Sequence, residues 1–90
     1  MQVSLKKENV VFSKWFQKSF WKINFMDKNF ILEKIWKIFS WEILPDIKKL
    51  KNYPNADFRL KIWNYRILFS YDKKNDKNLF ILVTHRKNLY

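Results

Sequence analysis

The 90-residue chain contains no cysteine and no glycine, and it has a single histidine. Without cysteine it forms no disulfide framework and no thiolate metal site. One imidazole and scattered carboxylates do not make the ligand sets that are typical of protein-bound zinc. We therefore expect neither a metal ion nor another cofactor.

Long apolar runs are also missing. None approaches the ~20 residues that a membrane-spanning helix needs. Lys14, Lys18 and Lys22 interrupt what would have to be the apolar core of a signal peptide. The sequence therefore predicts a cytoplasmic protein with no membrane partner.

Hydrophobic and aromatic residues are abundant, at 48% and 20% of the chain. This content gives a short chain the means to build a dense core, and 90 residues are the size of one domain. Residues 1–90 are expected to fold as a single domain.

The net charge of +11 favours a polyanionic partner, with nucleic acid before an anionic membrane or an acidic protein. Of the 19 basic residues only three are arginines, and all lie from residue 59 onward: Arg59, Arg66 and Arg86. Because the chain otherwise uses lysine, these positions indicate a need for the planar guanidinium, which binds phosphate bidentately. Ordinary ion pairing is the alternative explanation.

Two amphipathic helices, expected to form an antiparallel pair, are predicted in the first half. The first begins near Asn9 and ends near Asn24, and the second covers residues 28–41 with Asp27 as its N-cap. Hydrophobic residues recur with the helical period on both. The expected core-facing stripes are Phe12, Trp15, Phe16, Ser19, Phe20 and Ile23 on the first helix, and Ile31 or Leu32, Ile35, Trp36, Ile38 and Phe39 on the second.

Strand character dominates the second half. Val3 and Leu5 predict a short first strand, and after Pro45 comes a basic stretch at residues 48–51 and a turn at 53–57. Three further strands are then predicted, at residues 58–63, 65–71 and 79–84. The predicted fold is α+β in the order β-α-α-β-β-β, with two helices on one face of a small, mainly antiparallel sheet.

Strand alternation predicts which side chains share a surface. The more hydrophobic set should face the helices, namely Phe58, Leu60, Ile62, Tyr65, Ile67, Phe69 and Tyr71. The opposite surface, named the open face below, then carries Arg59, Lys61, Trp63 and Arg66, joined by Arg86 if that residue continues its strand. This convergence of cations predicts an anion-binding site.

The C-terminal half contains three linked features: residues 58–69, FRLKIWNYRILF, the strand at 79–84, and the segment 85–90, HRKNLY. In these features it resembles the RelE/ParE toxin superfamily. The family pattern is an aromatic residue, alternating basic residues, a Gly-Asp-Tyr-Arg-like turn, two strands joined by a variable hairpin, and a final His-Arg…Tyr. The basic segment at 48–51, KKLK, matches another recurrent feature, so the match covers about residues 45–90.

This resemblance implies the toxin of a toxin–antitoxin system. The partner would be an acidic, partly disordered antitoxin, and the toxin is expected to be monomeric outside that complex. The RelE branch cuts messenger RNA in the ribosomal A site without a metal, whereas the ParE branch poisons DNA gyrase. The C-terminal His-Arg…Tyr, with Lys61 and Arg66, is more similar to the RelE branch. The predicted activity is a metal-independent endoribonuclease; a gyrase inhibitor and a non-catalytic basic RNA-binding protein are the alternatives.

Cleavage without a metal uses the 2′-hydroxyl of RNA to attack the adjacent phosphate. The reaction needs a base, cations for the charged transition state, and an acid for the leaving 5′-oxygen. Lys61 is the candidate base, because neighbouring cations favour its neutral form. Arg66 is expected to stabilise the transition state, and Arg86 to bind the phosphate and assist the leaving group. Tyr90 would stack on a base or donate its hydroxyl.

Two further residues, Arg59 and Lys51, are expected to hold flanking phosphates. Trp63 stands where the family has glycine, so a positive φ there carries a steric cost. Trp63 is expected either to stack on RNA from the open face or to fill the reshaped turn.

His85 is a second candidate base, because it is the only histidine. Strand alternation, however, places it opposite Arg86, on the side of Leu79, Ile81 and Val83. A buried, hydrogen-bonded structural role is therefore the prediction for His85.

Overall fold

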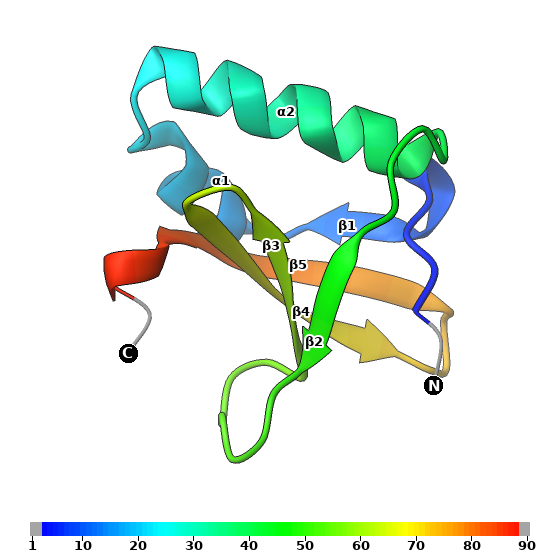
Figure 1. Cartoon of the computed structure of the whole chain (residues 1–90). Helices are drawn as coiled ribbons and strands as arrows, with labels where there is room; N and C mark the ends of the chain where they lie inside the picture. The colour runs from blue at the N-terminus through cyan, green and yellow to red at the C-terminus, as the bar shows by residue number, and fades with distance from the viewer. Residues whose placement is uncertain (1–2, 89–90) are drawn as a thin grey trace.

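The computed structural model describes residues 3–88 and shows two helices on one face of a five-stranded sheet (Figure 1). The strands are β1 (Val10–Phe12), β2 (Asp46–Lys49), β3 (Phe58–Ile62), β4 (Tyr65–Asp72) and β5 (Lys77–His85). The helices are α1 (Lys14–Trp21) and α2 (Phe25–Phe39), and short 3-10 turns cover Lys7–Asn9 and Arg86–Asn88. The strand order is β1-β5-β4-β3-β2, with β1 parallel to β5 and the other neighbours antiparallel. The predicted fold class is confirmed.

The first strand lies at Val10–Phe12, so the strand predicted at Val3 and Leu5 is wrong. Leu5 is instead buried in the core. The side-chain amide of the buried Asn78 donates a hydrogen bond to the Ser4 carbonyl at 3.3 Å. A side-chain contact, rather than a strand ladder, therefore ties this segment to the sheet.

Both helices begin at caps other than those predicted. Ser13, not Asn9, caps α1: its Oγ accepts a hydrogen bond from the Phe16 N–H at 3.0 Å. Asn24, predicted to end the first helix, caps α2 by accepting from the Asp27 N–H at 2.9 Å. Asp27 therefore lies inside the first turn of α2.

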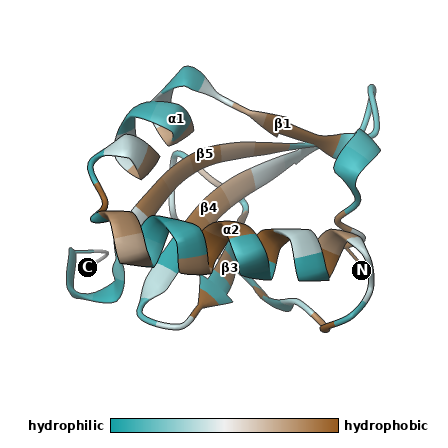
Figure 2. Ribbon diagram, turned by 90° about the horizontal axis from the view of Figure 1, so that it is seen from above, coloured by the Kyte–Doolittle hydropathy of each residue, from teal (hydrophilic) through white to brown (hydrophobic). Residues whose placement is uncertain are grey.

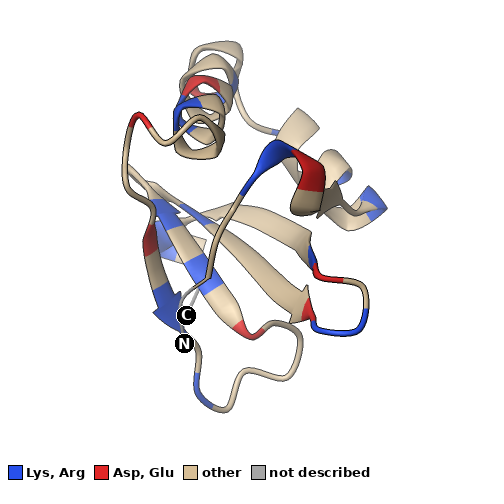
Figure 3. Ribbon diagram, turned by 90° about the vertical axis from the view of Figure 1, so that its right-hand side faces the viewer, with Lys and Arg blue, Asp and Glu red and all other residues tan. Residues whose placement is uncertain are grey.

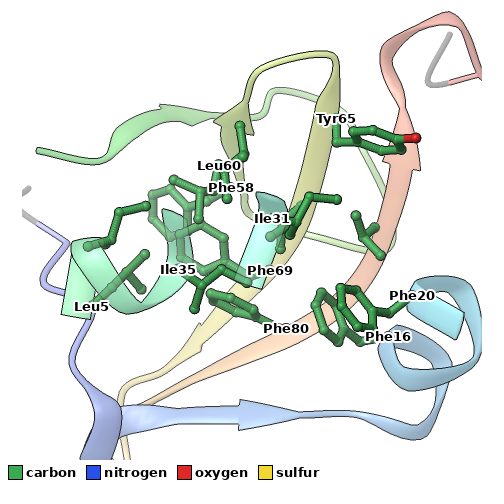
Figure 4. Close-up of a cluster of buried hydrophobic side chains, with 14 residues drawn as sticks. Leu5, Phe16, Phe20, Ile31, Ile35, Phe58, Leu60, Tyr65, Phe69 and Phe80 are labelled. Atoms are coloured by element: carbon green, nitrogen blue, oxygen red, sulfur yellow. The ribbon is translucent and has the colours of Figure 1, made fainter. Parts of the chain in front are cut away.

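Phe69 and Phe80 lie fully buried at the centre of the core, beneath Ile31 and Ile35 of α2 (Figure 4). The choice left open between Ile31 and Leu32 is thus resolved in favour of Ile31. Hydrophobic colouring covers β1, most of β5 and part of β4, and β4 is the middle strand of the sheet (Figure 2).

Two predicted core tryptophans are on the surface. Trp15 is 70% exposed and Trp36 is 52% exposed. Helix α1 is only eight residues long and buries just Phe16 and Phe20, while Trp36 stands beside the row that α2 presents to the sheet. On each helix, fewer of the hydrophobic residues are buried than the helical period of the sequence predicts.

The ladder between β4 and β5 contains one irregularity. Leu68 pairs with Leu82, but Phe69 pairs with Phe80, so Ile81 is an extra residue on β5. A bulge of this kind shifts the alternation of side chains by one residue. Leu79 and Val83 therefore do not share a face, and that part of the prediction is wrong.

Candidate functional site

The candidate site is built across the open face near the β3–β4 turn. Lys61 and Arg66 are directly opposed on β3 and β4, and opposed residues on neighbouring strands place their side chains on the same face. Asp46 of β2 pairs with Lys61, and Thr84 of β5 pairs with Arg66. We call these four residues the Lys61 row.

A second row lies beside it. Lys48, Arg59, Leu68 and Leu82 are paired in the same way across the four strands. Lys and Arg recur along the strands at the β2 edge of the sheet (Figure 3). Lys48 was not among the predicted site residues, because no strand was expected at β2, although the apolar Ile47 between polar neighbours is a weak signal of alternation.

The open face is covered in part by the loop that joins β2 to β3. Leu68 is only 1% exposed although it points away from the helices. Tyr53 and Asn55 of the loop line a hollow together with Leu68 and Leu82. The open face was expected to be uncovered throughout, and in the structure only the part beside the β3–β4 turn is free of this loop.

Arg59 is half-buried, although it was expected on an uncovered face. Its side chain is 18% exposed, and Nη1 lies 3.8 Å from Asp46 Oδ1. Within residues 3–88 the buried Nη1 has no hydrogen-bond partner. Leaving a buried donor unsatisfied is costly, so an anion bound beside Arg59 would be stabilised.

The Arg66 guanidinium is fixed at the β3–β4 turn. Its Nη1 donates to the carbonyl oxygens of Trp63 and Tyr65, both at 3.0 Å. These two carbonyls orient the guanidinium beside the turn. Arg66 is therefore a positioned cation in the Lys61 row.

Trp63 adopts a φ of 54°, whereas its turn neighbour Asn64 does not have a positive φ. This is the backbone pattern of a type II′ hairpin turn, whose first central residue is usually glycine. The Trp63 ring packs edge-to-face on Phe30 of α2, with 5.5 Å between centroids. Trp63 therefore has the positive φ that was expected to carry a steric cost. Its ring fills the turn on the helix side. The alternative position on the open face is wrong, because strand alternation does not extend into the turn.

His85 lies on the helix side of the sheet together with Val83, as predicted, but it is half-buried rather than buried. Its ring packs edge-to-face on Tyr65, at 5.3 Å between centroids. Its Nδ1 accepts a hydrogen bond from the Lys87 N–H at 3.2 Å. This contact fixes the orientation of the ring from its Nδ1 side.

The remaining predicted residues lie at the margins of the site. Arg86 does not continue β5; it begins the last 3-10 turn, and its N–H donates to the Asn64 carbonyl at 2.7 Å beside the β3–β4 turn. Lys51 is exposed in the loop after β2, beyond the opposite end of the face. Tyr90 lies outside the described residues.

Tyr65 links the site to α2. Its ring lies at the rim of the core with the hydroxyl directed away from the cluster (Figure 4). The hydroxyl donates a hydrogen bond to Asp27 Oδ2 at 2.7 Å. Burial, reinforced by this carboxylate, raises the pKa of Tyr65 from 10.0 to about 12.

We expect Tyr65 to form tyrosinate only at the alkaline end of a titration of the folded protein. Because its folded pKa is raised, the stability that it contributes is complete below the unfolded value of 10.0 and is lost as the pH rises toward about 12. Tyrosinate absorbance measured against pH should show this late transition, and Tyr65→Phe should remove it. A late transition that persists in Tyr65→Phe, and disappears in the control Tyr53→Phe, would contradict the assignment.

Two features are absent from residues 3–88. This part of the chain holds no group of three or more His, Cys, Asp or Glu side chains that could bind a metal ion. Nor does any helix in it have the length and apolar character to cross a membrane.

Solved structures of similar fold are toxin–antitoxin complexes. A chain of the RelBE2 complex of Mycobacterium tuberculosis matches with a TM-score of 0.69 and 22% identity, over 87% of the present chain and 96% of the matched one. The RelB–RelE complex of Methanococcus jannaschii matches with a TM-score of 0.64 and 30% identity, over 89% and 94%. The RelE–RelB complex of Pyrococcus horikoshii matches with a TM-score of 0.61 and 18% identity, over 89% and 96%. No family model and no curated protein sequence matches the chain.

Proposed function

Because this chain belongs to the RelE-like toxin superfamily, we propose that it is the toxin of a toxin–antitoxin system and that it cuts messenger RNA on the ribosome. The observation that supports cleavage most directly is the pairing of Lys61 with Arg66 across β3 and β4. Two cations on one uncovered surface can contact the same phosphate. The backbone of Arg86 lies beside the same turn, which supports a role for its side chain as a third cation.

The proposed reaction is attack of a 2′-hydroxyl on the adjacent phosphorus. Lys61 takes the hydroxyl proton while the 2′-oxygen forms its bond to phosphorus. Arg66 and Arg86 stabilise the negative charge that gathers on the phosphoryl oxygens. The bond to the 5′-oxygen breaks, and that oxygen receives a proton from the Tyr90 hydroxyl. The products are a 2′,3′-cyclic phosphate and a 5′-hydroxyl end.

The proposed protein partner is an acidic antitoxin. The net charge of +11 supports this, because an acidic chain relieves the mutual repulsion of the basic residues. Large apolar side chains are also exposed on and around the helices, including Trp21, Phe25, Met26 and Leu44. A partner that offers both carboxylates and apolar side chains would cover them.

Expression of this chain without a partner is expected to arrest translation. Messages should be cut inside their coding regions, and the new ends should carry a cyclic phosphate and a 5′-hydroxyl. Mapping of message ends after induction tests this directly. The matched control is Lys61→Ala/Arg66→Ala, which should leave messages intact.

Two outcomes would contradict the ribonuclease. Growth arrest with intact messages and gyrase-dependent DNA damage would assign the chain to the ParE type of activity. Absence of any growth effect from soluble, folded protein would favour a non-catalytic RNA-binding protein.

A further inference from the structure

Trp15 is an exposed tryptophan at an edge of the sheet. Strand β1 pairs with β5 only at the start of that strand. Beyond it, α1 lies along β5 through two serines: Ser13 Oγ donates to the Ile81 carbonyl at 3.2 Å, and Ser19 Oγ accepts from the Val83 N–H at 3.0 Å. Trp15 stands between these serines in sequence and is 70% exposed. Its position is therefore fixed, although its indole is not used to build the core.

A hollow of about 670 Å³ opens beside Trp15, between α1 and the end of β5. Lys18 and Lys22 line its α1 side, and Tyr65 and His85 line its sheet side. Among the described residues that line the hollow, the two with a formal charge are Lys18 and Lys22, and both are basic. The hollow thus combines aromatic rings with positive charge.

This hollow continues into the open face. Thr84 lines it and is also the register partner of Arg66 in the Lys61 row. Trp15 and Leu82 line it as well, and both also line the hollow beneath the β2–β3 loop. A chain bound at the Lys61 row can therefore pass around the edge of β5 and remain in contact with the protein.

We propose that this hollow is a second RNA subsite, which holds nucleotides adjoining the cleaved phosphate. A base stacks on Trp15, while Lys18 and Lys22 contact phosphates of the same strand. Single-stranded RNA is bound in this way, by aromatic stacking of unpaired bases and by cations along the backbone. The inference rests on the proposed function, since it extends the path of the same message.

The test uses 2′-O-methyl RNA oligonucleotides of mixed sequence and increasing length. They lack the 2′-hydroxyl and so are not cut, and fluorescence anisotropy gives their Kd. The wild-type chain is expected to bind more tightly as the oligonucleotide becomes long enough to reach both surfaces. Trp15→Ala/Lys18→Ala should lose this gain, binding long oligonucleotides on the order of tenfold more weakly, as loss of one stacked base implies.

The matched control removes an equivalent pair elsewhere. Lys7 Nζ lies 5.7 Å from the Trp36 ring, against 5.8 Å for Lys18 and Trp15, so Lys7→Ala/Trp36→Ala makes the same change in charge and aromatic content. Its affinity should stay within about twofold of wild type. Equal losses in the two variants, or no loss in Trp15→Ala/Lys18→Ala, would overturn the subsite. Message cleavage is measured separately, so failure of the subsite and failure of the ribonuclease are distinguishable.

Discussion

Replacement of Lys61 or Arg66 by alanine is expected to lower the single-turnover rate of message cleavage on saturated ribosomes by on the order of 10²–10⁴-fold. Both side chains belong to the Lys61 row and act, in the proposed reaction, on atoms whose charge changes at the transition state. Interactions of that kind affect the chemical step more than binding. Purified protein and programmed ribosomes, with cleavage followed in a rapid-quench experiment, give the rate.

Arg59 and Lys51 provide the matched comparison. As flanking phosphate ligands they contact groups whose charge is unchanged by the reaction, so Arg59→Ala or Lys51→Ala should mainly raise the apparent KM. Arg59 is expected to show the larger increase, because within residues 3–88 its largely buried guanidinium is paired with a single carboxylate, that of Asp46, at the long separation of 3.8 Å. A fall in the saturated rate as large as that of Lys61→Ala would contradict this division.

Lys61→Arg separates a base from a phosphate clamp. It keeps the positive charge but removes a group that can accept a proton at working pH, so we expect it to cut nearly as poorly as Lys61→Ala. His85 lies on the other side of the sheet and its Nδ1 already accepts the Lys87 N–H, so His85→Ala should retain most of the rate. If Lys61→Arg cuts normally and a folded His85→Ala is inactive, the base is His85.

The part of the site on β3 and β4 was predictable from the sequence. Arg59, Lys61 and Arg66 alternate with apolar residues that are all buried, so the period of the strand placed the three cations on one face. The β2 contribution was not predictable. Four polar-rich residues after a proline carry little strand signal, and pairing with β3 alone makes Asp46–Lys49 a strand.

Errors in side-chain position arose where tertiary contacts override the local period. The extra residue Ile81 shifts the alternation along β5, and nothing in the apolar run at residues 79–84 indicates where such a shift falls. Trp63 leaves the open face because the two-residue turn, not the strand, directs it toward Phe30. Trp15 satisfies a helical stripe, but α1 lies along β5 in a way that leaves the Trp15 side chain 70% exposed.

The basic surface predicts a steep dependence of RNA binding on salt. Six cations lie on the open face or at its margins, namely Lys48, Lys51, Arg59, Lys61, Arg66 and Arg86. If each neutralises one phosphate of a single-stranded oligonucleotide too short to reach Lys18 and Lys22, the slope of log affinity against log salt is roughly −4, and raising salt from about 50 to about 200 mM weakens binding roughly 300-fold.

The salt experiment uses the uncleavable 2′-O-methyl oligonucleotides, with two variants of the protein that each lose two positive charges. Lys48→Gln/Arg59→Gln should make the slope shallower by roughly 1.4, because two phosphate contacts are lost. Lys73→Gln/Lys74→Gln removes the same charge from the β4–β5 hairpin, away from the Lys61 row, and should leave the slope unchanged. The same change of slope in both variants would mean that the salt dependence of binding comes from the total charge and not from the open face. A flat dependence in the wild-type chain would show that the basic surface does not contact phosphates and that its charge is a consequence of lysine-rich composition.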